Sequence, residues 1–382
     1  MWAVLFYCCA GAILYTYVGY PALLYLFSFY KRVNKKDAPA HLPSVTIIIA
    51  AFNEERVIEA KLHNTLSLDY LAHKLQIIVA ADGSTDDTVR IASSFSAVLV
   101  LHEPLRKGKA AAINKAVTFA TNEIIVLTDA NSTLSKQTID QLVAPFSQQK
   151  VGAVAGEKKV VSTEGAIASG EGLYWRYESW LKQQETKFYT VVGAAGELVA
   201  FRKELFVTIP EKTITDDFFI SLSINLQHRK LAYVADAISS ETASLSLTDE
   251  WKRKVRIAAG GIQSLFVLRA ALDPFRYPLL AFQFFSHRVM RWIACAPAFV
   301  FLLLINMLLV NQQTSELYTW LLILQLLFYM LAFAGWVMVK QKRSFFLFNI
   351  PFYIVFMHAA MLAGMMGYAS GKQSVLWEKA KR

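Results

Sequence analysis

Four long stretches of this chain contain no charged residue. They are Met1–Tyr30, Trp292–Ser315, Leu317–Val339 and Ser344–Gly371. Each is long enough to cross about 30 Å of hydrocarbon as a helix, which needs about 20 residues. The stretch from about residue 41 to residue 273 carries most of the charge and has the length of one globular domain. The pattern therefore predicts a globular domain held between membrane-spanning segments, one before it and about three after it.

The residues that flank the apolar stretches predict a topology. The first stretch lacks a basic start and a small-residue cleavage pattern, so we expect a retained anchor and not a signal peptide. The basic run Lys31–Lys36 places its carboxyl end in the cytoplasm and the amino terminus outside. Four crossings would return the carboxyl terminus outside, although the basic tail at 372–382 favours the inside. We favour four crossings; Pro351 leaves a re-entrant path for the last stretch as the alternative.

Within the charged region, short apolar runs alternate with helical patterns. Runs of isoleucine, valine and leucine without polar alternation are typical of strands buried on both faces. We expect strands at the starts of Val45–Glu55 and Leu75–Thr88 and at Ala97–Leu101, Ile124–Thr128, Val151–Val161 and Leu231–Ala237, and helices at Gly108–Ala120, Gly165–Lys187 and within Thr213–Gln227. This alternation predicts an α/β fold with a doubly wound, mostly parallel sheet.

These patterns divide the chain into five parts. We expect an anchor at 1–30, the α/β domain at 41–247, amphipathic interfacial helices at 248–290, membrane segments at 291–371 and a basic tail at 372–382. The net charge of +10 comes largely from basic residues beside the apolar stretches, such as Lys252–Arg256, His287–Arg291 and Lys340–Arg343. Topology and anionic lipid explain this charge better than nucleic acid does, so no nucleic-acid partner is expected.

The run Ile124–Leu134, IIVLTDANSTL, ends its apolar part on Asp129, with Asn131 two residues later. In an open α/β sheet, groups at the carboxyl ends of the strands face the ligand crevice. An acid there can hold a divalent cation that bridges phosphate oxygens, which predicts Mg²⁺ or Mn²⁺ at Asp129 and Asn131. The alternative is an Asp-Ala-Asn turn that only caps the next helix.

A second acid, Asp82, ends an earlier strand at a glycine turn. A carboxylate in that place can accept a hydrogen bond from a base N–H or a ribose hydroxyl, or can simply form an Asp-Gly turn. Lys107, Gly108 and Lys109 open the next helix, where backbone amides and ammonium charge can meet a phosphate. The sequence has neither G-x-G-x-x-G nor a Walker P-loop, which argues against dinucleotides and ATP hydrolysis.

Two adjacent acids, Asp216 and Asp217, are bounded by hydrophobic residues. They suit either the start of a helix or a general base that deprotonates a sugar hydroxyl. Arg253 and Arg256 carry guanidinium groups that match the oxygens of a leaving pyrophosphate. From local sequence alone, a basic patch on the membrane surface explains these arginines equally well.

Together these motifs resemble those of the membrane-integrated family 2 glycosyltransferases, the GT-A-fold superfamily that includes cellulose, chitin and hyaluronan synthases. The resemblance covers nearly the whole chain, and its parts occur in the family's order: AAFNEE, ADGSTDDT, RKGKAAAIN, LTDAN, GAAGELVAFRKELF, TDD and RKVRI. It implies an inverting transferase in a bacterial inner membrane, with its catalytic domain in the cytoplasm. The donor would be a nucleotide-diphosphate sugar, most simply a UDP-sugar. The acceptor would be a hydroxyl of a saccharide or lipid-linked saccharide in cell-surface polysaccharide synthesis.

The resemblance also implies roles for individual residues. Asp217 matches the base of the T-E-D motif, with Asp216 in place of the glutamate, and Asp129 and Asn131 correspond to the metal-binding D-x-D. The remaining nucleotide-sugar contacts would come from Ala51, Glu54, Asp82, Lys109, Arg253 and Arg256. Our own hypothesis is that the loop with Gly193, Ala195, Gly196 and Glu197 lines the acceptor and sugar pocket, with Trp175 and Trp180 as stacking platforms. For at least one of these tryptophans we favour core packing as the alternative role.

The chain departs from the family pattern in three places. Asn131 replaces the second acid of D-x-D, and Asp216 replaces a glutamate. RKVRI keeps Arg256 but lacks the glutamine and tryptophan of Q-R-x-R-W, which the resemblance ties to processive synthesis. Processivity is therefore not implied, whereas the reaction class is.

Two other functions remain open on the sequence. A polyprenyl-phosphate glycosyltransferase shares the first acidic motifs, but its acceptor is already ionised and needs no base like Asp217. A transporter with a nucleotide-sensing domain would be expected to carry ionisable groups in its spans, and the last three spans contain no Asp, Glu, Lys or Arg. If the spans form a conduit for a glycan, a second copy or a partner subunit would be needed to complete it.

Overall fold

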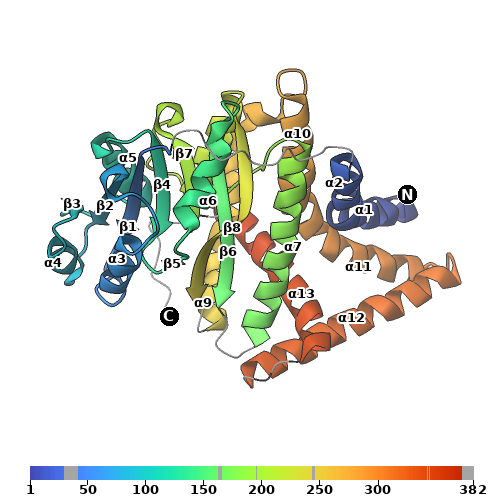
Figure 1. Cartoon of the computed structure of the whole chain (residues 1–382). Coiled ribbons are helices and arrows are strands. Elements are labelled where there is room, and N and C mark those ends of the chain that lie inside the picture. Colours follow the sequence, from blue (N-terminus) through green and yellow to red (C-terminus); the bar gives the residue numbers. More distant parts are fainter. Residues whose placement is uncertain are drawn as a thin grey trace.

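The computed structural model describes residues 1–29, 42–161, 166–194, 196–242, 246–341, 343 and 345–371. An α/β domain built on one large sheet lies beside a group of long apolar helices, which gather on the right of Figure 1. The basic run Lys31–Lys36 and the tail at 372–382, which we used to predict the topology, lie outside the described residues.

The described strands form a single eight-stranded sheet. Their order is β3-β2-β1-β4-β7-β6-β8-β5. Strands β3, β2, β1 and β4 pair in parallel, as do β6 and β8, whereas β7 runs antiparallel to both β4 and β6, and β5 runs antiparallel to β8. The bounds are β1 Val45–Ala51, β2 Leu75–Asp82, β3 Val98–Glu103, β4 Ile124–Asp129, β5 Thr133–Leu134, β6 Val151–Val161, β7 Leu198–Arg202 and β8 Lys230–Thr242. The α/β fold with a mostly parallel sheet is therefore confirmed.

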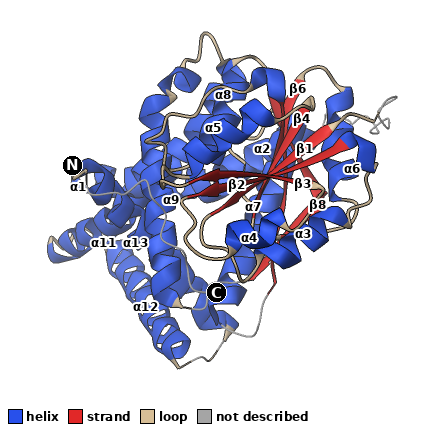
Figure 2. Cartoon of the chain, turned by 90° about the vertical axis from the view of Figure 1, so that its left-hand side faces the viewer, coloured by secondary structure: helices blue, strands red, loops and turns tan. Residues whose placement is uncertain are grey.

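Helices cover both faces of the sheet (Figure 2). Alternate side chains of β1 enter two separate cores: Ile48 packs on one face, and Ile47 and Ile49 pack on the other. The α-helices between β1 and the second apolar segment are α3 Ile58–Leu66, α4 Thr88–Ser93, α5 Lys109–Phe119, α6 Thr138–Val143, α7 Ala166–Phe188, α8 Asp216–Leu226 and α9 Leu247–Val267, and α10 Pro278–Phe284 begins that segment. The double-sided core explains why the central strands are apolar without alternation.

Strand β7 is the main element that the hydrophobic pattern did not predict. Its five residues closely follow a run of small residues, Gly193–Gly196, which has no strand pattern of its own. The strand forms because it fills the space between β4 and β6 in the middle of the sheet. Strand β8 also runs five residues beyond the expected Ala237, because its far end pairs with β6 up to Thr242.

Four helical segments in the described residues are long and apolar enough to cross a membrane. They are Trp2–Ser28, Pro278–Asn311, Glu316–Lys340 and Leu347–Ala369. The first comprises α1 (Trp2–Leu14) and α2 (Tyr20–Phe29), and the others include α11 (Ala296–Asn311), α12 (Glu316–Lys340) and α13 (Phe346–Ala369). One amino-terminal and three carboxyl-terminal segments agree with the expected arrangement. Helix α13 continues through Pro351, so the chain is not broken there.

The structure corrects our explanation of the basic residues at His287–Arg291. The second apolar segment begins at Pro278 and not at Trp292, so these residues lie inside it. They are buried against α7 and not exposed to lipid headgroups. His287 Nδ1 lies 2.7 Å from Glu185, and Arg291 pairs with Glu178. Two acids on the neighbouring helix compensate this charge, which is how buried ions are usually accommodated.

Helix α9 joins the last apolar helix to the α/β domain. Gly364 of α13 lies so close to α9 that an added Cβ would stand 2.6 Å from the Cβ of Ala258. Two residues further along, Gly260 of α9 leaves equally little room beside Thr215, the residue before α8. The segment that we expected to lie in the membrane interface is therefore packed between α13 and the start of α8.

Candidate functional site

Three parallel strands end at the same edge of the sheet. Ala51, Asp82 and Asp129 are the last residues of β1, β2 and β4. The strands are in register, with Ala50 opposite Asp129 and Ala51 opposite Ala81, so these ends are neighbours in space. This edge is where an open α/β sheet binds its ligands.

Asp82 is buried and holds the loop that follows β3. Its Oδ1 accepts a hydrogen bond from the backbone N–H of Lys107 at 2.7 Å, and its Oδ2 accepts one from Gly108, also at 2.7 Å. At Gly83, where φ is +68°, an added Cβ would stand 2.7 Å from the backbone nitrogen of Arg106. The turn after β2 therefore requires glycine, and Asp82 fixes the backbone that leads into α5.

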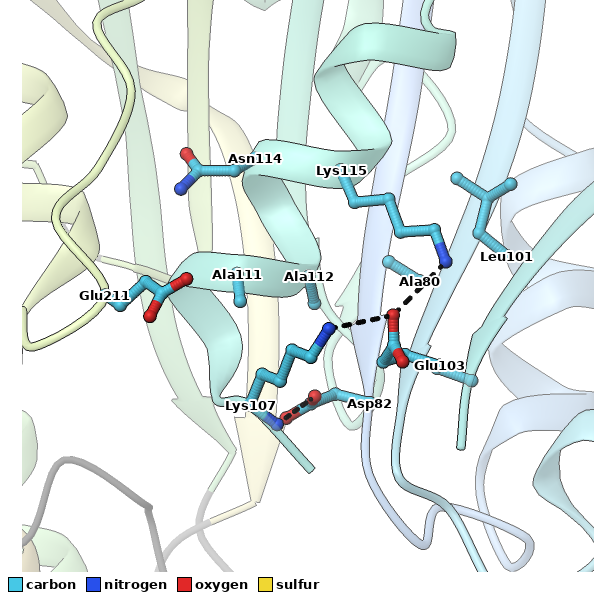
Figure 3. A pocket seen from close by; sticks show the side chains of 11 residues that line it. Ala80, Asp82, Leu101, Glu103, Lys107, Ala111, Ala112, Asn114, Lys115 and Glu211 are labelled. Atoms are coloured by element: carbon cyan, nitrogen blue, oxygen red, sulfur yellow. Dashed lines mark hydrogen bonds and ion pairs between the residues drawn. The ribbon is translucent and has the colours of Figure 1, made fainter. Parts of the chain in front are cut away.

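A cavity of about 200 Å³ opens beside Asp82 (Figure 3). Strand β2 forms one wall, and α5 contributes Asn114 and Lys115 to another. Glu103 lies between two lysines, with its Oε2 3.5 Å from Nζ of both Lys107 and Lys115. The cavity thus combines an apolar floor with polar groups at its rim, as small-molecule sites commonly do.

The loop after β1 is tied to the loop after β2. Asn53 has a left-handed backbone, with φ 54°, and its Oδ1 accepts a hydrogen bond from the backbone of Thr85 at 2.8 Å. The backbone N–H of Glu54 donates to Oγ1 of Thr88 at 2.7 Å. These bonds hold Glu54 near the carboxyl end of β2, on the same edge of the sheet as Asp82.

Lys109 is the centre of a cluster of charges. It is the first residue of α5, and its Nζ lies 2.8 Å from Oδ1 of Asp129 and 3.6 Å from Oδ2 of Asp216. Burial disfavours its charge, but Asp129 and Asp216 outweigh that effect and hold the pKa of Lys109 above its ordinary value. The ammonium group therefore stays charged and links the end of β4 to the start of α8.

Asp217 has the environment of a tuned acid–base group. Burial, followed by the like charge of Asp216, raises its pKa to about 7, while Lys109 opposes the rise. Asp217 is half-buried and lies next to Gly196, where an added Cβ would make ordinary contact with Asp217 Cγ at 3.5 Å. A carboxylate with a pKa near neutrality can accept a proton from a hydroxyl and release it again at physiological pH.

The loop before β7 passes directly over the start of α8. Gly193 has φ +114°, and an added Cβ would stand 2.5 Å from the ring of Phe218. Ala195, predicted to line the pocket, lies outside the described residues. Glu197 is paired with the buried ammonium of Lys158, which also pairs with Glu241 at 2.8 Å. Although burial opposes ionisation, Lys158 holds the pKa of Glu197 well below its usual range.

The two arginines of α9 have different surroundings. Arg253 donates to both carboxylate oxygens of Glu250 at 3.0 Å. Arg256 lies in the field of Asp216, Asp217 and Asp129; burial lowers its pKa, and these carboxylates partly restore it. Arg256 therefore belongs to the charged cluster, whereas the guanidinium of Arg253 is held by its own helix.

Asp129 and Asn131 suit a divalent cation that takes few ligands from the protein. The carboxylate of Asp129 is about one-third exposed, and only its Oδ1 is bound by Lys109. No group of three or more His, Cys, Asp or Glu side chains in the described chain is placed to hold a metal ion. One carboxylate and one amide oxygen nevertheless fit Mg²⁺ or Mn²⁺, which commonly keep water and substrate phosphates as their remaining ligands.

Lys61, which the sequence analysis did not single out, binds the residues on either side of the turn that carries Asp129 and Asn131. It is buried on α3, and its Nζ donates to Thr128 Oγ1 at 2.9 Å and to the Ser132 carbonyl at 2.8 Å. Burial lowers its pKa to about 7, although Asp129 opposes that change. The sequence did contain a sign that Lys61 is buried. Lys61 lies three residues after Ile58 and four before Thr65, on the face of the helix that is buried.

The two tryptophans of α7 lie in different places. Trp180 is partly exposed and stacks on Tyr25 of α2, with ring centroids 6.4 Å apart, so it packs against the first apolar segment. Trp175 faces the ammonium groups of Lys158, Lys182 and Lys254. Lys158 in turn pairs with Glu197, and the neighbouring Gly196 lies next to Asp217. Trp175 is therefore connected to Asp217 through these contacts, whereas Trp180 packs against α2.

Parts of this chain are similar to known glycosyltransferases. Residues 46–209 match the family model described as glycosyl transferase family 2. A β-monoglucosyldiacylglycerol synthase of Nostoc sp. is 29% identical over 265 residues, which are 65% of this chain and 55% of that protein. A poly-β-1,6-N-acetyl-D-glucosamine synthase of Staphylococcus aureus is 26% identical over 66% of this chain and 63% of its own length. The chain thus spans less than two thirds of the length of these relatives.

A solved structure shows the same fold over nearly the whole chain. It is a mannosyltransferase from Pyrobaculum calidifontis in complex with GDP-Man and Mn²⁺, and its TM-score is 0.73 at 22% identity. The similarity covers 97% of this chain and 100% of that one. Residues 46–209 thus match the family 2 glycosyl transferase model, and the chain has the fold of the mannosyltransferase, with four helices that are long and apolar enough to span a membrane.

Proposed function

We propose that this protein is an inverting glycosyltransferase that moves a sugar from a nucleotide-diphosphate sugar to a hydroxyl group of a saccharide or lipid-linked saccharide. The observation that carries the proposal is the position of Asp217. A half-buried carboxyl whose pKa is raised to about 7 lies beside Gly196 and within the field of Lys109 and Arg256. In this proposal Asp217 faces the acceptor hydroxyl, and Lys109 and Arg256 face the pyrophosphate of the donor.

The donor side of the site is basic where a leaving group would need it. Direct displacement at the anomeric carbon leaves negative charge on the departing pyrophosphate, which must be stabilised as the bond breaks. Lys109 and Arg256 supply fixed positive charge there, and Asp82 holds the loop that presents Lys109. We propose that Ala51, Glu54 and Asp82 border the nucleoside, and a UDP-sugar is our first choice of donor.

Asp217 acts as the general base in this proposal. As the acceptor oxygen bonds to the anomeric carbon, the bond from that carbon to the pyrophosphate oxygen breaks, and the hydroxyl proton passes to Asp217. Attack from the opposite side inverts the configuration. Asp216 has a supporting role, because its charge contributes to the raised pKa of Asp217 and its carboxylate lies near Lys109.

The residues at the end of β4 would hold Mg²⁺ or Mn²⁺. When bound to Asp129 and Asn131, such a cation supplies additional charge stabilisation for the phosphate oxygens. The neighbour of the same fold was solved with Mn²⁺, which supports the choice of metal. Lys61 keeps the turn in place by binding the residues on either side of it, Thr128 and Ser132.

The setting of the reaction follows from the helices. We propose that the catalytic domain lies at the cytoplasmic face of a bacterial inner membrane and that the product belongs to a cell-surface glycan or glycolipid. The named relatives make a glycolipid and a polysaccharide, which supports both acceptor classes. Whether the protein acts alone or as an oligomer would be measured on the purified membrane protein.

The first experiment measures release of nucleotide diphosphate by the full chain in detergent. It uses a panel of UDP-, GDP- and dTDP-sugars with Mn²⁺, with Mg²⁺ and with EDTA. We expect metal-dependent release from one donor, at least a hundredfold slower in Asp217→Asn, because removal of a general base typically costs about 10²–10⁴ in rate. Asp236→Asn, an exposed acid on β8, is the matched control and should behave as the wild type.

Donor binding is measured on the same samples. Asp217→Asn should bind the donor as the wild type does, since its side chain contacts the acceptor and not the nucleotide. Unchanged turnover in this variant would remove Asp217 from the mechanism. If no donor in the panel is turned over and none binds, the transferase proposal is refuted.

A further inference from the structure

Three buried lysines converge on Trp175 from three different elements. Lys158 belongs to β6, Lys182 to α7 and Lys254 to α9, and each is at most 5% exposed. Their ammonium nitrogens lie 5.2, 5.5 and 5.9 Å from the centroid of the Trp175 ring. Lysine is among the residues least often buried, so three on one indole need an explanation.

Two of these lysines are neutralised by neighbouring acids. Lys158 pairs with Glu197 and Glu241, and Lys254 Nζ lies 3.3 Å from Glu250. These pairs account for their burial, because charges are usually tolerated inside a protein when they have partners.

Lys182 is different. Its ammonium group makes no hydrogen bond and no ion pair with any residue in the described ranges; it faces only the rings of Trp175, at 5.5 Å, and Tyr233, at 5.6 Å. The carboxylates around it are engaged elsewhere. Glu178 pairs with Arg291, and Glu157 accepts a hydrogen bond from Tyr233. A mostly buried ammonium is costly unless it is paired, and the described residues supply neither an acid nor a hydrogen-bond acceptor within bonding distance of Lys182.

The cluster adjoins the proposed base. Lys158 contacts Glu197, whose neighbour Gly196 lies against Asp217. Gly196 lies against Asp217, and the charge of Glu197 acts on it, whereas Lys109 pairs with Asp129 and Asp216 on the donor side. A ligand that reaches Lys182 therefore approaches Asp217 from the acceptor side.

The cluster also reaches the apolar helices. Lys254 lies 6.0 Å from the ring of Tyr353 in α13, and Tyr174 contacts the same ring at 6.2 Å. Trp251, one turn earlier on α9, contacts Phe356 of α13. A ligand at the cluster would therefore lie next to a helix that is long and apolar enough to span a membrane.

We propose that Lys182 binds a phosphate group on the acceptor, with Lys254 beside it and Trp175 as the platform for the adjoining sugar. This inference rests on the proposed function and narrows it, because it assigns the acceptor to the phosphate-bearing saccharides. In this proposal the phosphate is the group by which the acceptor is bound, and a sugar hydroxyl remains the nucleophile. A base is therefore still needed to ionise that hydroxyl. Phosphate oxygens accept hydrogen bonds from an ammonium group readily, and a sugar stacks on an indole face.

The proximity of α13 favours a lipid phosphate, but a soluble sugar phosphate has the same chemistry. Three probes separate these sources: glucosyl dodecyl phosphate, dodecyl glucoside, which lacks the phosphate, and glucose 1-phosphate, which lacks the chain. Binding to the full chain in neutral phosphatidylcholine nanodiscs is measured by calorimetry. Binding does not require turnover, so its result is independent of the donor assay.

Three variants test the role of the ammonium group. Lys182→Met removes the charge at similar length, Lys182→Arg retains the charge, and Lys187→Met changes an exposed lysine of the same helix as a control. We expect the wild type to bind glucosyl dodecyl phosphate at least tenfold more tightly than dodecyl glucoside. Lys182→Met should lose this preference, whereas Lys182→Arg and Lys187→Met should keep most of it. Thermal unfolding of each variant confirms that it is folded.

The outcomes separate the two proposals. If glucose 1-phosphate binds as tightly as glucosyl dodecyl phosphate, phosphate recognition by Lys182 is supported and the acceptor is a soluble sugar phosphate. Equal binding of dodecyl glucoside and glucosyl dodecyl phosphate by the wild type, or an unchanged preference in folded Lys182→Met, would overturn the inference. Asp217→Asn should retain the preference, so a failure of the proposed base leaves this test intact.

Discussion

Replacement of Asp216 by asparagine tests whether the charge beside the proposed base tunes it. The pKa of Asp217 rises from an ordinary 3.8 to about 7, which corresponds to about 4 kcal/mol against the ionised form. Burial is the first cause and the charge of Asp216 is the second. Asparagine keeps the size and the burial but removes the charge. We therefore expect the pKa of Asp217 to fall by about one unit, since burial remains.

The assay is the pH dependence of nucleotide diphosphate release between about pH 5 and pH 9, with donor and metal at saturation. A base with a pKa of about 7 is about one-tenth ionised at pH 6, and a base with a pKa about one unit lower is about half ionised there. Relative to its own plateau, Asp216→Asn should thus retain about fivefold more activity at pH 6 than the wild type. Its plateau should be lower, because a weaker base accepts the proton less readily.

One result would refute this reasoning. If the acid limb of Asp216→Asn stays at the pH of the wild type or moves to higher pH, the charge of Asp216 does not raise the pKa of the group that controls the rate. Asp236→Asn again serves as the control, because this exposed acid should leave the limb in place. A limb that persists in Asp217→Asn would assign it to a different group.

Three further predictions follow from the same site. Lys61→Met should raise the Mn²⁺ concentration for half-maximal activity about tenfold or more, because the turn that carries Asp129 and Asn131 loses its support; an unchanged metal titration would contradict this role. Gly193→Ala should destabilise the protein by about 1–3 kcal/mol, seen as a lower melting temperature, because φ is +114° and Phe218 leaves no room, whereas Gly196→Ala should fold normally. Removal of divalent cations with EDTA should abolish release of nucleotide diphosphate, and Mn²⁺ should restore it; activity that persists in EDTA would exclude the metal role of Asp129.

The sequence by itself determined the elements that have a strong local signal. The apolar strands β1, β2 and β4 are buried on both faces, so their composition alone identified them, and the acids at their ends marked the ligand edge of the sheet. The four apolar helices were evident from uncharged stretches of sufficient length. Asp217 and Lys109 were predicted as site residues because their motifs occur in a recognisable order.

Only the tertiary structure decided the contacts between distant parts of the chain. Strand β7 has five residues and forms because β4 and β6 lie on either side of it. From the sequence, we explained His287 and Arg291 as basic residues at the membrane surface. In the structure they are buried and lie beside Glu185 and Glu178 of α7. Likewise, no local pattern marks Lys182 as a buried lysine that has no ion-pair partner among the described residues. Burial and ion pairing depend on side chains that are remote in sequence, and a pattern along one segment does not contain them.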